Sequence, residues 1–295
     1  MTVPNKHVLQ QGPVLAALGR AALAAVKEQI GLNGTPKGPL TVPSAELVDH
    51  VPPRRRDLVR DFVKNVGGDP ERYRKTLPPA MFPQWTFPIA SKTLAGIPYP
   101  LIKVVNGGCR LEINKPLPND EPLEVRGQLV EIDDDGYRAV LHQRLATSTA
   151  SAPDAVVAHL YAIVPLKKRE GEKEKAKRHV PQHAREIWYG RIRRGAGLDF
   201  AKLTGDFNPI HWIPAYAKAS GFKSTILHGF ATMARAIEGL NNSVVPPGRR
   251  LQMVDVKFTR LLLLPATVGI YVDDAGGVFV GDAPGGSAYL MGTYS

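Results

Sequence analysis

The chain has 295 residues, 43% of them hydrophobic, which is enough to bury one large core or two ordinary ones. Its single cysteine, Cys109, excludes an intramolecular disulfide and a cysteine-based zinc cluster, and it favours a reducing compartment, so we expect a cytoplasmic protein. No run approaches the roughly 20 apolar residues of a membrane-spanning helix, and we expect no membrane span.

The formal net charge of +11 is concentrated in one segment. Residues 165–194 hold eleven Lys and Arg against four Asp and Glu, a net of +7. The segment has few aromatic residues and no nucleic-acid-binding motif, so we expect no nucleic acid partner. A solvated linker explains this composition most simply, although such a field would also attract an acidic carrier protein or a phosphate-bearing small molecule.

The first half of the chain shows helices followed by strands. Residues 12–31 predict a helix, residues 52–69 predict an exposed charged helix without a functional role, and residues 82–94 predict an apolar helix. Alternation and β-branched residues then predict antiparallel strands at 123–132, 138–146 and 155–165, the first two separated by the turn at 133–136.

The second half repeats this plan after a charged linker at 167–177. A strand at 188–194 and a polar loop precede a helical segment at 213–220, and an apolar stripe predicts a buried helix at 229–240. Strands are predicted at 251–262, 267–273, 278–280 and 288–292. Two halves, each a helix against an antiparallel sheet, indicate an α+β duplication.

The densest group of chemically reactive residues lies in the run TGDFNPIH at 204–211. Gly205 permits a tight bend and Pro209 stops helix continuation, so Asp206 and His211 lie on a shaped loop. A carboxylate and an imidazole aimed at one water can exchange protons in both directions, as hydration of a conjugated double bond requires. Asn208 can orient the water or hold the histidine tautomer.

A second candidate group begins the predicted buried helix. Gly229 at the helix N-terminus would offer a free backbone N–H to a developing oxyanion. His228 is expected to fill the turn structurally, with lining of the site as the alternative. A structural role is also open for the main run, because Asp and Asn commonly cap loop amides.

These residues resemble the MaoC-like hydratases and dehydratases, which include the (R)-specific enoyl-CoA hydratases. The resemblance rests on FAKLTGDFNPIH, WIPAYAKASGFKSTILHGFATMARA and VDVKFTRLLLLPATVGIYV, about 100 residues from 199 onward. It implies a hotdog fold with a sheet wrapped around a central helix, here a double hotdog with a degenerate first half. The expected domains are 1–164 (degenerate module with a helical extension), 165–186 (basic linker) and 187–295 (catalytic module).

The resemblance assigns Asp206 and His211 as the catalytic pair, Asn208 as a site-shaping residue and Gly229 as the thioester carbonyl donor. It implies a hydro-lyase that adds water to trans-2-enoyl thioesters to give (R)-3-hydroxyacyl thioesters of coenzyme A or acyl-carrier protein. It also implies no cofactor and no metal. A hotdog thioesterase and a non-catalytic acyl-thioester-binding subunit stay open as alternatives, as does a homodimer.

Overall fold

The computed structural model describes residues 2–17, 19, 41–100, 104–167 and 178–295. Its first half contains η1 (Asn5–Gln10), β1 (Leu47–Val51), α2 (Arg56–Asn65), η2 (Pro70–Tyr73), β2 (Thr76–Leu77), η3 (Pro79–Met81), α3 (Pro83–Thr93), β3 (Val105–Ile113), β4 (Leu117–Pro118), β5 (Leu123–Asp134), β6 (Arg138–Ser148) and β7 (Val156–Pro165). Its second half contains β8 (Arg185–Ile192), α4 (Ala196–Thr204), η5 (Pro209–His211), α5 (Pro214–Ala219), α6 (Gly229–Ser243), β9 (Met253–Phe258), β10 (Ala266–Val272), β11 (Gly277–Gly281) and β12 (Ala288–Tyr294).

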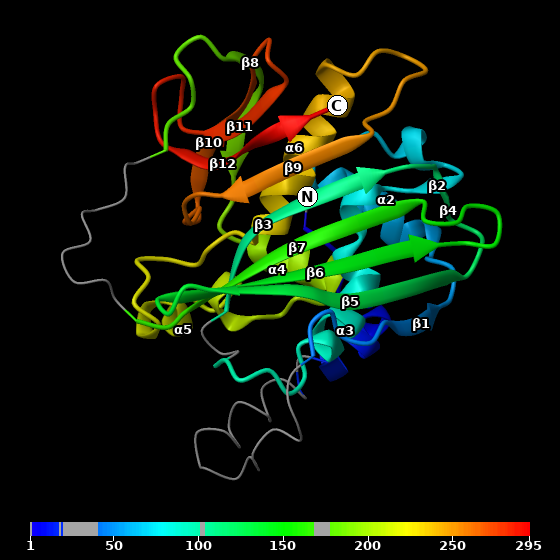
Figure 1. Ribbon diagram of the computed structural model, residues 1–295. Helices are drawn as coiled ribbons and strands as arrows, with labels where there is room; N and C mark the ends of the chain where they lie inside the picture. Colours follow the sequence, from blue (N-terminus) through cyan, green and yellow to red (C-terminus); the bar gives the residue numbers. More distant parts are fainter. Residues whose placement is uncertain (1, 18, 20–40, 101–103, 168–177) are drawn as a thin grey trace.

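The main sheet has ten antiparallel strands in the order β1-β5-β6-β7-β3-β9-β12-β11-β10-β8. Each half contributes five strands, and the halves meet where β3 pairs with β9, from Gly108 opposite Lys257 to Glu112 opposite Met253. Figure 1 shows β3 and β9 side by side at the middle of this sheet, with the long helices behind it. The expected pair of sheets is therefore joined edge to edge into one continuous sheet.

The two apolar helices form the centre of each half. Helix α3 packs on β5, β6 and β1, while α6 packs on β8, β9 and β11. The inward face of β5 is buried and alternates with half-exposed positions, as a strand with one covered face requires. The predicted helices at 82–94 and 229–240 and the sheet-around-helix architecture are thus confirmed. Among the described residues, no helix is long and apolar enough to cross a membrane.

Two local predictions were wrong. The helix predicted at 52–69 as exposed is α2, which buries Leu58, Val59, Phe62 and Val63. Its Phe62 ring packs 6.1 Å from that of Phe200 in α4. The segment predicted as a polar loop after residue 194 forms α4. Of the helix predicted at 12–31, residues 12–17 and 19 are helical and the rest lies outside the described residues.

The order of elements is the same in both halves. Strands β1, β5, β6, β7 and β3 take the places that β8, β10, β11, β12 and β9 take in the second half. Helix α2 lies between the first strand and α3, as α4 lies between β8 and α6. The segment 66–82 that leads into α3 therefore corresponds to the segment 205–228 that leads into α6. The module boundaries within the chain stay a prediction.

Candidate active site

The TGDFNPIH run begins where α4 ends. Gly205 follows the helix with φ +85°, a left-handed conformation that costs glycine nothing. A side chain at this position would also meet Val14, whose Cβ would lie 2.6 Å from the added Cβ. The loop therefore leaves the helix in a direction that only glycine allows.

The loop after Gly205 is closed by its own polar groups. Asp206 Oδ1 accepts the backbone N–H of Asn208 at 3.3 Å, and Asn208 Oδ1 accepts that of Ile210 at 3.3 Å. Asn208 is thereby the N-cap of the short turn η5, with Pro209 in its first position, where no N–H is needed. The predicted shaped loop is present, and the turn places His211 at its end.

Asp206, His211 and His228 come together on one side of this loop, with one side-chain ligand atom of each within 4.8 Å of the others. The rings of His211 and His228 stack with centroids 3.6 Å apart and planes 25° apart. His228 Nε2 also lies 3.8 Å from Asp206 Oδ2. His228, expected mainly to fill the turn, is buried and belongs to the cluster.

Backbone carbonyls set the tautomer of each histidine. Because a carbonyl oxygen only accepts, His211 Nδ1 donates to Ile226 O at 2.8 Å and its Nε2 carries the lone pair. In the same way His228 Nε2 donates to Asp206 O at 2.9 Å. The His211 tautomer is therefore held by Ile226 and not by Asn208. The Nε2 lone pair of His211 suits a proton acceptor.

Burial makes His228 a neutral partner. Desolvation, with the charge of His211 as a smaller cause, lowers the pKa of His228 to about 3. The His228 ring therefore stays uncharged at neutral pH and stacks on His211 as a neutral ring.

Three ligand atoms at this spacing raise the question of a metal ion. An imidazole binds a metal through a lone pair in its ring plane. The His211 and His228 planes are stacked, and one nitrogen of each already donates to a carbonyl. In-plane lone pairs of stacked rings do not converge on one point, so the arrangement suits proton transfer better than chelation.

Gly229 is the first residue of α6, directly after the N-cap His228. Its N–H is among the first four of the helix, which have no carbonyl partner within the helix, and the helix dipole adds positive potential there. A Cβ on Gly229 would lie 3.1 Å from the Phe258 ring, so the absence of a side chain allows this ring to pack close to the backbone of residue 229.

An aromatic cluster adjoins Gly229 and draws on both halves. Phe230 packs edge-on against Phe258 with centroids 6.0 Å apart and against Phe82 with centroids 5.3 Å apart. Phe82 comes from the first half and is buried. The first half therefore supplies part of the apolar surface next to the candidate site.

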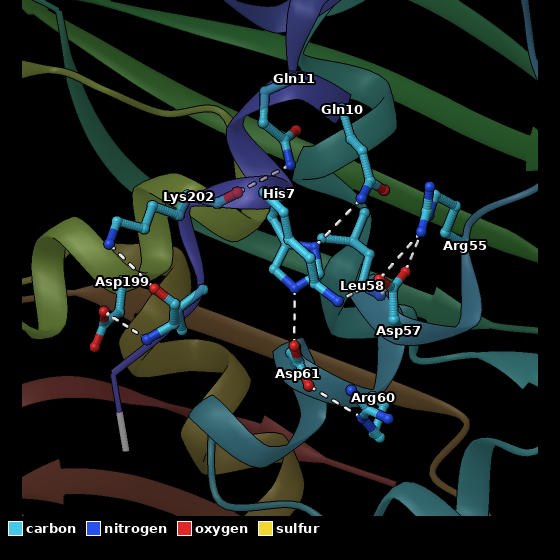
Figure 2. Close-up of polar contacts among 12 residues, drawn as sticks. His7, Gln10, Gln11, Arg55, Asp57, Leu58, Arg60, Asp61, Asp199 and Lys202 are labelled. Atoms are coloured by element: carbon cyan, nitrogen blue, oxygen red, sulfur yellow. Dashed lines mark hydrogen bonds and ion pairs between the residues drawn. The ribbon is translucent and has the colours of Figure 1, made fainter.

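The N-terminal segment, residues 3–17, is hydrogen-bonded to α4; Figure 2 shows the contact between Gln11 and Lys202. The Val3 N–H donates to Asp199 Oδ1 at 3.1 Å, and Lys202 Nζ donates to Val3 O at 3.1 Å. Gln11 Nε2 donates to Lys202 O at 3.1 Å. All four residues are buried. The backbone N–H and C=O of Val3 are therefore bound by the side chains of Asp199 and Lys202, both on the helix that leads into the candidate site.

The same segment is tied to α2. His7 Nε2 lies 2.8 Å from Asp61 Oδ2, and the His7 side chain is fully buried (Figure 2). These contacts join residues up to 199 positions apart, so neither periodicity nor a local motif predicts them. The one available signal was that Asp199 and Lys202 are charged residues on an otherwise apolar helix, which suggests buried partners.

Known proteins share both the sequence and the fold around this site. The family described as "MaoC like domain" matches residues 185–280. The 3-hydroxyacyl-thioester dehydratase X of Mycobacterium tuberculosis is 36% identical over 104 residues, which are 35% of this chain and 34% of that protein. The enoyl-CoA hydratase ChsH3 of the same organism is 25% identical over 155 residues, 51% of this chain and 53% of that protein. The sequence matches thus span one third to one half of these relatives.

Solved structures extend the likeness in fold to most of the chain. A crystal structure of HtdX from Mycobacterium tuberculosis superposes with a TM-score of 0.69 at 19% identity, over 85% of this chain and 99% of that one. A further protein of that organism, described as a double hotdog, gives a TM-score of 0.53 at 13% identity over 87% and 97% of the two chains. The chain therefore carries a MaoC-like domain at residues 185–280 within a double-hotdog fold.

Proposed function

We propose that the protein is a hydro-lyase that reversibly hydrates trans-2-enoyl thioesters to (R)-3-hydroxyacyl thioesters. The observation that carries the proposal is the pairing of Asp206 with His211 on the loop of a MaoC-like domain, with the His211 lone pair on Nε2. The names of the related dehydratase and hydratase support the reaction class.

In the proposed reaction, the pair holds one water over C3 of the enoyl group. The water oxygen forms a bond to C3 while one of its protons passes to His211 Nε2, and the other hydrogen remains in the new hydroxyl group. The pair returns one proton to C2, so that one water is added in total. The hydrogen bond from His211 Nδ1 to Ile226 O stabilises the imidazolium formed in between.

The thioester carbonyl needs a donor while C2 gains enolate character. Gly229 N–H is the proposed donor, because it combines an amide that has no acceptor within the helix with the positive end of the α6 dipole. Asn208 is proposed to shape the loop through its cap, and His228 to support His211 from its buried face.

We further propose that the thiol part carries phosphate, as coenzyme A and the acyl-carrier-protein arm both do. An open cavity of about 460 Å³ adjoins the start of α4. Four basic side chains and two acidic ones line it, namely Lys64, Arg191, Arg193 and Arg235 against Asp61 and Asp199. Burial lowers the pKa of Arg235 to about 10, which leaves it charged at neutral pH. The excess positive charge suits a phosphate group.

The test is the hydration rate across an enoyl-CoA series from about four carbons upward, followed by loss of enoyl absorbance and repeated with a carrier-protein thioester. Asp206→Asn and His211→Ala should each lower kcat by two orders of magnitude or more, as expected for loss of general acid–base catalysis. Asp120→Asn and His50→Ala change the same residue types at exposed positions and should leave kcat unchanged.

Three other outcomes would contradict the proposed reaction or its residues. Release of free thiol without loss of the enoyl absorbance would replace hydration by thioester hydrolysis. Binding of every enoyl thioester without turnover would indicate a binding subunit. Full activity in both site variants would refute the residue assignment.

We also propose a cytoplasmic location, which the buried, unpaired Cys109 supports.

A further inference from the structure

The first half contains a counterpart, at residues 67–73, of the proposed catalytic loop at residues 205–211. It follows α2 as the catalytic loop follows α4, and it also begins with a left-handed glycine: Gly67 has φ +87°, compared with +85° for Gly205. Both loops lead toward the central helix of their half. The backbone course after the supporting helix is therefore the same in the two halves.

The two loops also share their internal turn. Asp69 Oδ1 accepts the N–H of Glu71 at 3.0 Å, as Asn208 Oδ1 accepts that of Ile210. In each case the capping residue is followed by a proline and a 3-10 turn, η2 in the first half and η5 in the second. Loop 67–73 is thus the same structural device as the catalytic loop, one residue shorter between glycine and proline.

The chemistry of loop 67–73 is different. Gly68 follows the left-handed glycine where Asp206 does in the second half, and Arg72 stands two residues after the proline where His211 does. A Cβ on Gly68 would lie 2.4 Å from Glu238 Oε2, so a carboxylate from α6 fills the space beside it. Tyr73 donates to Glu238 Oε1 at 2.6 Å. The loop therefore lacks counterparts of the proposed catalytic pair and carries the cation of Arg72 instead.

An open pocket of about 250 Å³ lies beside this loop, between the two halves of the chain. Its apolar wall includes Leu77 and Leu117 from the first half and Ile237 from the second. Arg72, Arg249 and Arg250 also line it, and Arg250 Nη2 donates to Asn114 O at 2.9 Å. The described residues that line the pocket include no acidic side chain.

The Arg72 side chain is held in place by α6. Its Nη2 donates to Asn241 O at 2.7 Å, and Asn241 Nδ2 donates to Tyr73 Oη at 3.0 Å. The cation is therefore anchored to α6 by a bond that uses one of its five N–H donors. A guanidinium fixed at the edge of an apolar pocket suits a ligand with a carboxylate head.

We propose that loop 67–73 and this pocket form a second, non-catalytic site that binds a carboxylate with a short apolar chain. The head contacts Arg72 and its neighbouring guanidinium groups, and the chain lies against the apolar wall. A volume of 250 Å³ equals about eight water-sized groups, which fits a chain of roughly six to eight carbons.

Binding of sodium octanoate, measured by isothermal titration calorimetry on the full chain, tests the site. Arg72→Met should weaken binding about tenfold or more, since a charge-assisted hydrogen bond is lost. Thr76→Trp fills the pocket from its half-exposed rim and should abolish binding. Arg74→Met removes an exposed arginine of the same segment and should bind like the parent. Circular dichroism confirms that each variant is folded.

Three further measurements distinguish this site from the catalytic site and from nonspecific binding. Octanamide lacks the charge and acetate lacks the chain, so neither should bind like octanoate; equal binding of either overturns the proposal. Octanoate should bind the His211→Ala variant unchanged, whereas loss of binding there would place it in the catalytic site. Absence of saturable octanoate binding also overturns the proposal. Octanoate has no double bond to hydrate, so this result is independent of the proposed reaction.

Discussion

The buried Glu238 gives the sharpest prediction about stability. This side chain of α6 is fully buried, Tyr73 donates to Oε1, and Oε2 has no hydrogen-bond partner among the described residues. Desolvation raises its pKa from 4.5 to about 7, against the opposite effect of Tyr73 and Arg72. Between pH 4.5 and 7 the folded chain therefore holds a proton that the unfolded chain has released.

The sign and size of the effect follow from proton linkage. A native state that binds more protons than the unfolded state loses stability as the pH rises. A pKa difference of about 2.5, at 1.36 kcal/mol per unit, means that Glu238 costs roughly 3 kcal/mol of unfolding free energy above pH 7 and nothing below pH 4.5. Glu238→Gln keeps an acceptor for Tyr73 and removes the titration.

The assay is urea unfolding of the parent and of Glu238→Gln at pH 5 and pH 8, followed by tryptophan fluorescence. The stability of the variant relative to the parent should rise by about 2 to 3 kcal/mol from pH 5 to pH 8. Glu131→Gln removes an exposed carboxylate from β5 and should show no such change. A Glu238→Gln difference that is independent of pH would show that burial does not keep this carboxyl protonated.

Three further predictions concern the support of the candidate site. Lys202→Met leaves the Val3 carbonyl buried without a donor and should cost about 1 to 3 kcal/mol of unfolding free energy in thermal or urea denaturation, with a fall in kcat larger than the change in KM. Gly205→Ala forces a Cβ onto a left-handed residue and against Val14, and should cost more than about 1 kcal/mol by the same measurement; a neutral result would mean that the loop entry can relax. For His228, whose folded pKa is lowered to about 3, stability should fall by up to about 1.4 kcal/mol per pH unit below pH 6.5, and unfolding of His228→Gln should lack this component.

Helices, strands and turns whose residues follow a local pattern were predicted from the sequence. The apolar stripe at 229–240 follows one face of a helix, and the alternation at 123–132 follows one face of a sheet. Both elements were therefore predicted near their observed bounds. The loop around Pro209 was predicted for the same reason, because glycine and proline restrict the backbone wherever they occur.

The features that the sequence did not predict, α4 and the place of His228, depend on tertiary packing. Helix α4 was missed because its polar start at 193–195 looks like a loop, and its burial depends on α2 and on residues 3–17. His228 was expected to fill a turn, yet it lies against His211 because the loop at 205–211 folds back onto the start of α6. Neither contact is local: the residues that bury α4 lie far from it in the sequence, and the contact of His228 with Asp206 O spans 22 positions. A single sequence does not reveal such contacts.

The duplicated loops show why a motif has to be interpreted position by position. A left-handed glycine, a capping Asp or Asn and a proline are sufficient to build the turn, and both halves contain them. The turn therefore shows only how the backbone runs. The proposed reactivity depends on the residue after the glycine and on the one two places after the proline. These are Asp206 and His211 in one half and Gly68 and Arg72 in the other. If Arg72 binds a carboxylate as proposed, one backbone device serves proton transfer in one half and charge recognition in the other, by exchange of two side chains.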